Sequence, residues 1–182
     1  MILSASWDDG AKTDLKMAEL MQKYNIPCTF YWPSMIGNHK NKGKAKSFLS
    51  IDECKELSKT FEIGSHSMSH QFMNKLDIAR ISNEIHESRK FWQDCTGQPI
   101  ESFAYPKDSF SSLTKALVKG AGYTNARTNQ VGSLIAGDDL FSKKCTLQVA
   151  INRLEYKNKS WVLFSDEMMG KVVDDSIFHI FG

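Results

Sequence analysis

Residues 2–10 of the chain read ILSASWDDG, and this stretch decides the fold. Its opening apolar run predicts a short buried strand, and Asp8 and Asp9 follow directly. Two adjacent carboxylates at a buried strand end cost desolvation and mutual repulsion unless a cation lies beside them. Successive strand residues point to opposite sides, so one carboxylate suits a metal ion while the other stays free to take a proton. The alternative is a solvated turn, in which Gly10 gives the backbone its freedom.

Outward from this strand, short apolar runs alternate with helical patterns, which is typical of βα units and a parallel sheet. No repeat or linker divides the sequence, so we expect one catalytic domain over residues 1–182. The expected strands are 2–6, 27–32, 61–64, 102–105, 123–126, 147–151 and 176–181, and the expected helices cover about 13–24, 77–95, 111–119 and 161–173, with another starting at the capping residue Ser50.

The bulk composition is that of an ordinary globular chain of 182 residues, with 41% hydrophobic and 24% charged residues. A formal net charge of +2 gives no reason to expect a nucleic acid or an anionic membrane as partner. We interpret the basic cluster Lys40, Lys42, Lys44 and Lys46 as a solvated loop, with contact to an anionic substrate as the alternative. The oligomeric state is left open.

The sequence also indicates in which cellular compartment the protein is expected. It has no run of about 18 apolar residues, so no membrane span is expected. Its N-terminus lacks the charged and apolar regions of a signal peptide. The default expectation is therefore a cytoplasmic protein, or a secreted one if a leader has been lost.

A second polar segment, 64–70, reads GSHSMSH. Two imidazoles four residues apart, at His66 and His70, can face one point and supply two neutral nitrogen ligands. Such a spacing also occurs by chance. Combined with an aspartate at the end of the first strand, it gives the two-histidine, one-carboxylate set with an open position that catalytic zinc uses.

The last expected strand contains His179. A lone histidine among apolar residues is more often a core residue than a catalyst. Closing a barrel would, however, bring the last strand beside the first, and His179 with it. We interpret His39, in the lysine loop, and His86, on the flank of the long helix, as residues without a catalytic role.

Taken together, these motifs resemble the polysaccharide deacetylases with the NodB homology domain. The resemblance rests on four segments spread over almost the whole chain. They are Ser6-Trp7-Asp8-Asp9-Gly10, His66-Ser67-Met68-Ser69-His70, Phe103-Ala104-Tyr105-Pro106 and Ile177-Phe178-His179. The first two are specific, whereas the last two are weak by themselves.

The resemblance implies a deformed (β/α)7 barrel, a relative of the TIM barrel, and assigns roles to its residues. Asp8 is then the general base and His179 the general acid. The backbone N–H near Lys107 is the oxyanion donor, and Tyr105 is a candidate contact for substrate. Asp9, His66 and His70 are the ligands of Zn²⁺ or of another divalent transition metal such as Co²⁺ or Ni²⁺.

The chain departs from the family pattern in two places. Many members carry an arginine in the third motif that pairs with the catalytic aspartate, whereas this chain has Ala104. Our hypothesis is that Arg127, at the end of a neighbouring strand, supplies that guanidinium and orients Asp8. The chain also stops three residues after His179, so the barrel is expected to close loosely or to be truncated. Trp32 suits either stacking on a sugar face or a core position.

The resemblance implies a metal-dependent hydrolase that removes N-acetyl groups from amino-sugar polymers or oligomers of the chitin or peptidoglycan type. One alternative is a cytosolic amidase that acts on a small non-sugar amide or ureide, which the lack of a leader favours. Another is a carbohydrate-binding domain whose catalysis has decayed, which Ala104 favours and which an intact Asp8 opposes.

Overall fold

The structure is a computed structural model that describes residues 1–36, 47–135, 137–151 and 153–182. The lysine cluster of residues 40–46 and His39 lie outside the described residues. The described strands are β1 (Ile2–Asp8), β2 (Cys28–Trp32), β3 (Glu62–Ser65), β4 (Ser102–Ala104), β5 (Asn125–Arg127), β6 (Leu147–Gln148) and β7 (Ile177–Phe181). The helices are α1 (Asp14–Lys23), α2 (Ile51–Ser58), α3 (Ile78–Thr96), α4 (Ser112–Gly120) and α5 (Trp161–Met169), with short 3₁₀ turns η1 (Met73–Lys75), η2 (Pro106–Asp108) and η3 (Leu154–Tyr156).

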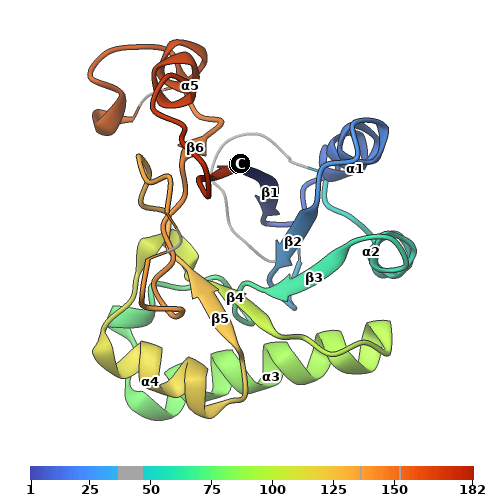
Figure 1. The fold of residues 1–182 in the computed structure, drawn as a ribbon. Coiled ribbons are helices and arrows are strands. Elements are labelled where there is room, and N and C mark those ends of the chain that lie inside the picture. The colour runs from blue at the N-terminus through green and yellow to red at the C-terminus, as the bar shows by residue number, and fades with distance from the viewer. Residues whose placement is uncertain (37–46, 136, 152) are drawn as a thin grey trace.

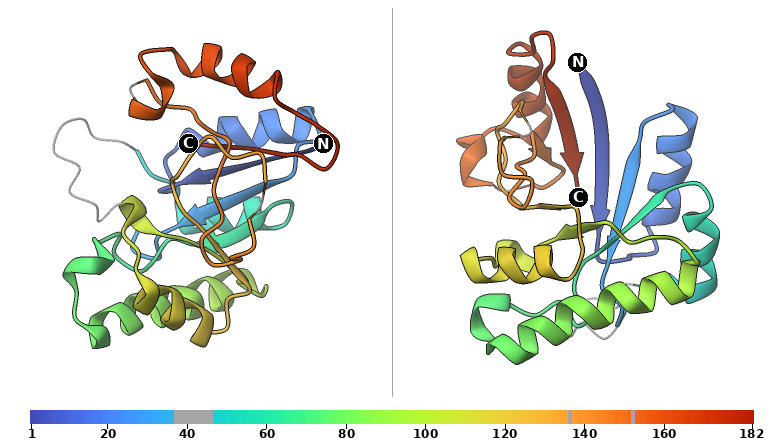
Figure 2. Two further views of the ribbon diagram at one scale, coloured as in Figure 1. Left: turned by 60° about the vertical axis from the view of Figure 1, so that its left-hand side comes forward. Right: turned by 60° about the horizontal axis from the view of Figure 1, so that its bottom comes forward.

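The described strands form one parallel sheet in the order β5-β4-β3-β2-β1-β7-β6. The sheet curls into a half-barrel with helices on its outer side (Figure 1). The first and last strands lie side by side (Figure 2), in a register that sets Ser4 opposite His179. This architecture confirms the expected α/β class and the deformed (β/α)7 barrel.

The two edge strands of the sheet, β5 and β6, do not pair with each other. A single segment spans the gap between them. Lys143 bonds to the β5 side through Ala126 O at 3.0 Å and Thr128 N at 2.9 Å, and the Thr146 amide donates to His179 O on β7 at 2.9 Å. The two edges of the half-barrel are therefore bridged by one extended segment rather than by a strand pair.

Most expected elements are confirmed, and the differences lie at their ends. Ser50 caps α2 through a reciprocal capping box with Glu53. The strand predicted over 147–151 ends at Gln148, because its partner β7 ends at Phe181 and the next residues turn back on themselves. Ile151 is consequently 85% exposed. The last helix ends at Met169, before Gly170, and not near residue 173.

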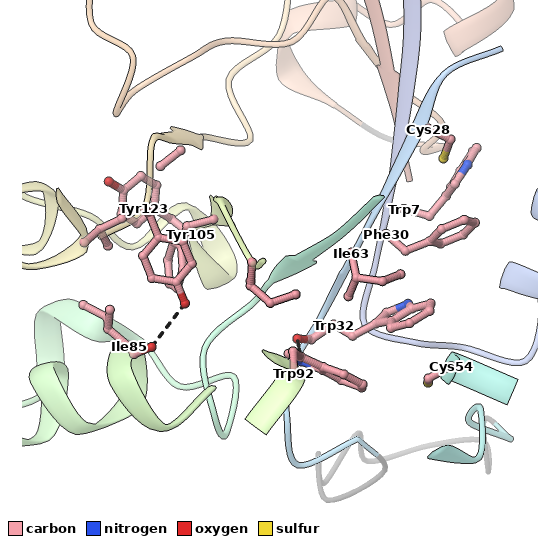
Figure 3. Packing of buried hydrophobic residues seen from close by; sticks show 14 of the residues in the cluster. Trp7, Cys28, Phe30, Trp32, Cys54, Ile63, Ile85, Trp92, Tyr105 and Tyr123 are labelled. Atoms are coloured by element: carbon pink, nitrogen blue, oxygen red, sulfur yellow. Dashed lines mark hydrogen bonds between the residues drawn. The ribbon is translucent and has the colours of Figure 1, made fainter. Parts of the chain in front are cut away.

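The main core packs between the outer face of the sheet and the helices, and Trp32 lies in it beside Trp92 (Figure 3). The Trp32 ring is fully buried, 5.5 Å from the ring of Trp92, and its Nε1 donates to Asp14 Oδ2 at 3.0 Å. The indole of Trp92 donates in turn to Trp32 O at 2.8 Å. Of the two interpretations of Trp32, the structure supports the core position. It corrects the expectation that this ring stacks on a sugar.

Candidate active site

Asp8 and Asp9 lie where β1 ends, at the carboxyl edge of the sheet, where loops of parallel α/β barrels converge. The backbone turns sharply here, because Asp9 and Gly10 both have positive φ angles, of 73° and 70°. The Asp9 amide donates to Tyr31 O at 3.2 Å, so the turn is tied to the neighbouring strand β2. Both carboxylates lie within 4.0 Å of His66 Nε2, but Asp8 pairs with Arg127 whereas Asp9 lies beside His70.

His66 and His70 are held by the loop that follows β3. The His66 amide donates to Trp32 O at 3.1 Å, and the His70 amide donates to Ser67 Oγ at 3.1 Å. Ser67 and His70 adopt positive φ angles of 64° and 56°. This tight backbone brings the two Nε2 atoms to 3.1 Å from each other.

A buried carboxylate on α3 anchors this loop, and the sequence analysis missed it. Glu84 is 4% exposed and accepts hydrogen bonds from both the amide (2.8 Å) and the hydroxyl of Ser69. The side chain lies on the inner face of α3 between Ile81 and Ile85. A charged residue inside an apolar stripe was the signal that could have identified it.

Asp9, His66 and His70 form a cluster of three groups that could hold a metal ion. Asp9 Oδ1 lies 3.2 Å from His70 Nε2 and 3.8 Å from His66 Nε2. A tetrahedral ion with ligand distances of about 2.0–2.1 Å separates its ligand atoms by about 3.3 Å, close to these separations. The three atoms are therefore spaced as the ligands of one ion would be.

Two further observations test whether these residues fit a metal. His66 Nδ1 lies 2.8 Å from Ala104 O, which can only accept, so Nδ1 carries the proton and Nε2 presents a lone pair. Asp9 Oδ1 is buried without a hydrogen-bond partner among the described residues. A buried carboxylate oxygen in that state is costly unless a cation satisfies it. The donor set and its surroundings fit a divalent transition metal.

Asp8 stands beside this cluster and is held by Arg127. The guanidinium donates through Nη2 to Asp8 Oδ1, and Asp8 Oδ2 lies 4.0 Å from His66 Nε2. The structure thus brings Arg127 to Asp8 as expected. One oxygen of Asp8 is fixed, and the other points towards the cluster.

Arg127 is itself tightly enclosed. Its guanidinium carbon lies 4.8 Å from the ring centroids of both Tyr31 and Phe181, and Nη1 donates to Asn129 Oδ1 at 3.0 Å. Burial is the largest single influence and lowers the pKa of the guanidinium, but the charge and hydrogen bond of Asp8, together with Cys145 and Tyr31, raise the pKa above its usual range. Arg127 is a permanent cation at this position.

Lys107 lies in η2, in an αL conformation with φ of 55°. Its ammonium is 4.5 Å from the ring centroid of Phe72, in the segment that follows His70. The strand before it ends at Ala104, the residue whose carbonyl accepts from His66. Lys107 thus follows the strand that contacts His66, and its role as a backbone donor stays a prediction.

Tyr105 does not offer its side chain to a substrate. The ring is fully buried and stacks on Phe110 at 5.1 Å, and its hydroxyl donates to Phe141 O at 3.0 Å. Burial raises the pKa of this phenol beyond its usual range. The expected substrate contact through this side chain is therefore replaced by a packing role.

The structure does not bring His179 to the carboxylate pair. In the β1–β7 register its backbone lies opposite Ser4, four residues before Asp8, and its ring extends as far as Ser6, two residues before Asp8. Its Nδ1 lies 2.8 Å from Ser4 Oγ and its Nε2 2.9 Å from Ser6 Oγ. Burial, and then the charges of Arg127 and Lys143, lower the pKa of His179 to about 3. A general acid must carry a proton that it can donate, so a buried, neutral His179 ring between Ser4 and Ser6 does not match the expected role.

The fold and the site together define a parallel α/β half-barrel with a candidate metal centre at its carboxyl end. The chain belongs to the polysaccharide deacetylase family, because the model of that family matches residues 2–126, more than half of the chain. Over 106 residues it is 26% identical to a bifunctional xylanase/deacetylase of Pseudobutyrivibrio xylanivorans, a match that covers 58% of this chain and 16% of that protein. The chain spans only 16% and 27% of the length of the curated relatives it matches.

Solved structures share the fold at low identity. The deacetylase PplD of Streptococcus pyogenes, in complex with acetate, superposes with a TM-score of 0.68 at 16% identity, covering 78% of this chain and 62% of that one. A pseudoenzyme of the CE4 family from Bacillus anthracis superposes with a TM-score of 0.64 at 14% identity, covering 99% of this chain and 54% of that one. None of the described helices is both long and apolar enough to span a membrane.

Proposed function

We propose that this chain is a metal-dependent hydrolase that removes N-acetyl groups from an amino-sugar polymer or oligomer, and that its metal is zinc or a similar divalent ion. The observation that carries the proposal is the Asp9, His66 and His70 cluster, beside which Asp8 keeps one oxygen that Arg127 does not hold. Membership of a deacetylase family supports the substrate class. The separations of the three ligand atoms and the unsatisfied Asp9 oxygen support the metal.

The chemistry divides between the metal and the side chains around it. A divalent ion held by Asp9, His66 and His70 would polarise the acetamide carbonyl and lower the pKa of water to about 7. Asp8 takes the proton of the attacking water through the oxygen that Arg127 leaves free. The Lys107 amide donates to the developing oxyanion, a contribution of about 3 kcal/mol for one such donor.

Cleavage of the C–N bond requires a proton on the leaving nitrogen, because an amine does not depart as an anion. Asp8 holds the proton taken from water and lies beside the reacting groups, so it can return that proton to the nitrogen. Acetate and a free amine result, and Asp8 is again a carboxylate. His179 has no part in this proposal, because its neutral ring lies between Ser4 and Ser6.

The test is acetate release from oligomers of N-acetylglucosamine by the purified protein. The proposal expects release that a chelator abolishes and that added zinc restores, and an exposed-histidine variant, His86→Ala, should behave like the wild type. Turnover of small amides but not of oligomers would favour the amidase alternative. Oligomer binding without turnover, whatever the metal, would favour a decayed domain such as the CE4 pseudoenzyme that shares this fold.

A further inference from the structure

The half-barrel contains a cavity of about 700 Å³ at the end opposite the candidate active site. Its walls include the first residues of several strands, among them Cys28, Ser102 and Asn125, and also Thr29. Interiors of parallel barrels are usually filled by layers of large branched side chains. Here the wall positions carry small polar residues, so the space stays open. Its volume lies in the range of small-molecule sites.

One side of the cavity is cationic, and Arg127 forms part of it. Both faces of this guanidinium are covered by the rings of Tyr31 and Phe181, while Nη2 and Nη1 donate to Asp8 and Asn129. The third nitrogen of the guanidinium, Nε, is buried and has no hydrogen-bond partner among the described residues. A buried N–H in that state is costly, so it marks a place where a ligand acceptor would be favoured.

Lys143 adds a second positive charge to the same wall. The side chain is partly buried, and no ion pair of the described residues includes its ammonium. Its charge and that of Arg127 both act on His179, which also lines the cavity and stays neutral. Arg127 is balanced by Asp8, so Lys143 supplies an uncompensated charge at this wall.

The cavity also has an apolar side, formed by Met21, Ile26, Phe61 and Ile177. One acidic residue, Glu62, lies on the rim. Its two carboxylate oxygens accept from Thr29 at 2.6 Å and from Ser102 at 2.7 Å. An anionic group would avoid Glu62 and lie at the Arg127 and Lys143 wall, with an apolar body against the isoleucines.

We propose that this cavity binds a small organic carboxylate, its head group at Arg127 and Lys143 and its apolar body against Ile26 and Ile177. This site is separate from the Asp9, His66 and His70 cluster, and the proposal does not depend on the deacetylase function. Because Arg127 contacts both Asp8 and the cavity wall, an occupant would touch the same guanidinium that holds Asp8.

The experiment uses three probes, hexanoate, 1-hexanol and hexylamine, which share a six-carbon chain and differ in their head group. Binding is followed by NMR of isoleucine δ1-methyl groups, in which Ile26 and Ile177 report the cavity and the fully buried Ile85 of α3 serves as an internal reference. We expect hexanoate to shift the first two signals and to leave Ile85 unchanged. We also expect it to bind about tenfold more tightly than the alcohol, with the amine weaker still.

Matched charge reversals test the head-group wall. Lys143→Glu should weaken hexanoate binding about tenfold or more, whereas Lys119→Glu, at an exposed position at the end of α4, should leave it unchanged. Lys143→Ala, which adds no repulsion, should lie between them and guards against misfolding of the reversal. Equal affinity for hexanol, preference for hexylamine, indifference to Lys143, or no shift at Ile26 and Ile177 would each overturn the proposal.

Discussion

The two ends of this half-barrel use polar residues in opposite ways. At the carboxyl end, Asp9, His66 and His70 come from two loops and converge within 4.8 Å of one another. At the amino end, the hydroxyls around a cavity of about 700 Å³ bond in two separate sets, Thr29 and Ser102 to Glu62, and Ser4 and Ser6 to His179. Loops that leave a strand can bend towards one point, whereas residues within strands are held apart by the sheet spacing of about 4.8 Å. Chemistry that needs several groups on one atom therefore belongs to the loop end.

Arg127 is the link between the two ends, since it pairs with Asp8 and also lines the cavity. A substitution at the carboxyl end should therefore abolish chemistry, one at Arg127 should weaken it, and one deeper in the barrel should change stability alone. The following predictions test this ordering from the largest effect to the smallest.

The largest effect is expected from loss of a candidate ligand. His66→Ala should lower kcat/KM for deacetylation by about 10⁴-fold, because the chemistry of metal-activated water is lost with the ion. The measurement is acetate release at saturating zinc. Activity within tenfold of the wild type would show that the cluster is not the reaction centre.

Asp8→Asn should cost about 10³-fold in kcat while zinc binding stays near that of the wild type, because an amide cannot take a proton from water. Acetate release and zinc titration on the same preparation separate the two properties. Loss of zinc together with activity would instead make Asp8 a ligand.

Arg127→Ala should lower kcat by about 10- to 100-fold, the range expected for loss of a hydrogen-bond partner that orients a reacting side chain. Arg127→Lys should restore little of it, because an ammonium lacks the planar fork that spans Asp8, Asn129 and the two rings. Steady-state kinetics of both variants with measured zinc content is the check. Full activity of the alanine variant would end the hypothesis that Arg127 orients Asp8.

The smallest effect is expected from His179, and it concerns stability. The folded-state pKa of about 3 lies below the ordinary 6.5, so the unfolded chain binds the proton more readily. Stability from this residue is present above pH 6.5 and is lost as the pH falls towards 3. Between pH 7 and pH 5 the loss should be about 2 kcal/mol.

His179→Gln should remove this contribution, so that its urea-unfolding free energy changes less between pH 7 and pH 5 than that of the wild type. His86→Gln, at an exposed position on α3, is the matched control. Deacetylation by His179→Gln should remain within about tenfold of the wild type after allowance for stability. A loss of several hundredfold would restore the general-acid role that the sequence predicts.

The parts of the site that could be predicted from the sequence are those encoded locally. Short spacings in the sequence limit how a carboxylate pair after a strand, or two histidines four residues apart, can be arranged. Asp9, His66 and His70 accordingly lie together as expected. Arg127 could be predicted as well, because Ala104 leaves Asp8 without its usual partner. The roles of these residues in catalysis remain predictions.

The features that could not be predicted depend on the register between paired strands and on the side to which a ring turns. His179 lies in the expected strand, but only the pairing of β7 with β1 sets it at the level of Ser4 instead of Asp8. The rings of Trp32 and Tyr105 lie in or beside the expected strands, yet packing around them turns both into the interior. Glu84 was missed because its partner, Ser69, lies in a loop whose path no periodic pattern describes.

The central claim is that residues 9, 66 and 70 hold one divalent ion, and zinc titration of chelator-treated protein by calorimetry tests it most directly. The account predicts about one zinc per chain for the wild type and for His86→Ala, and at least 100-fold weaker binding for Asp9→Ala and His70→Ala. Folded wild-type protein that binds no zinc, or ligand variants that bind it as tightly as the wild type, would contradict the account.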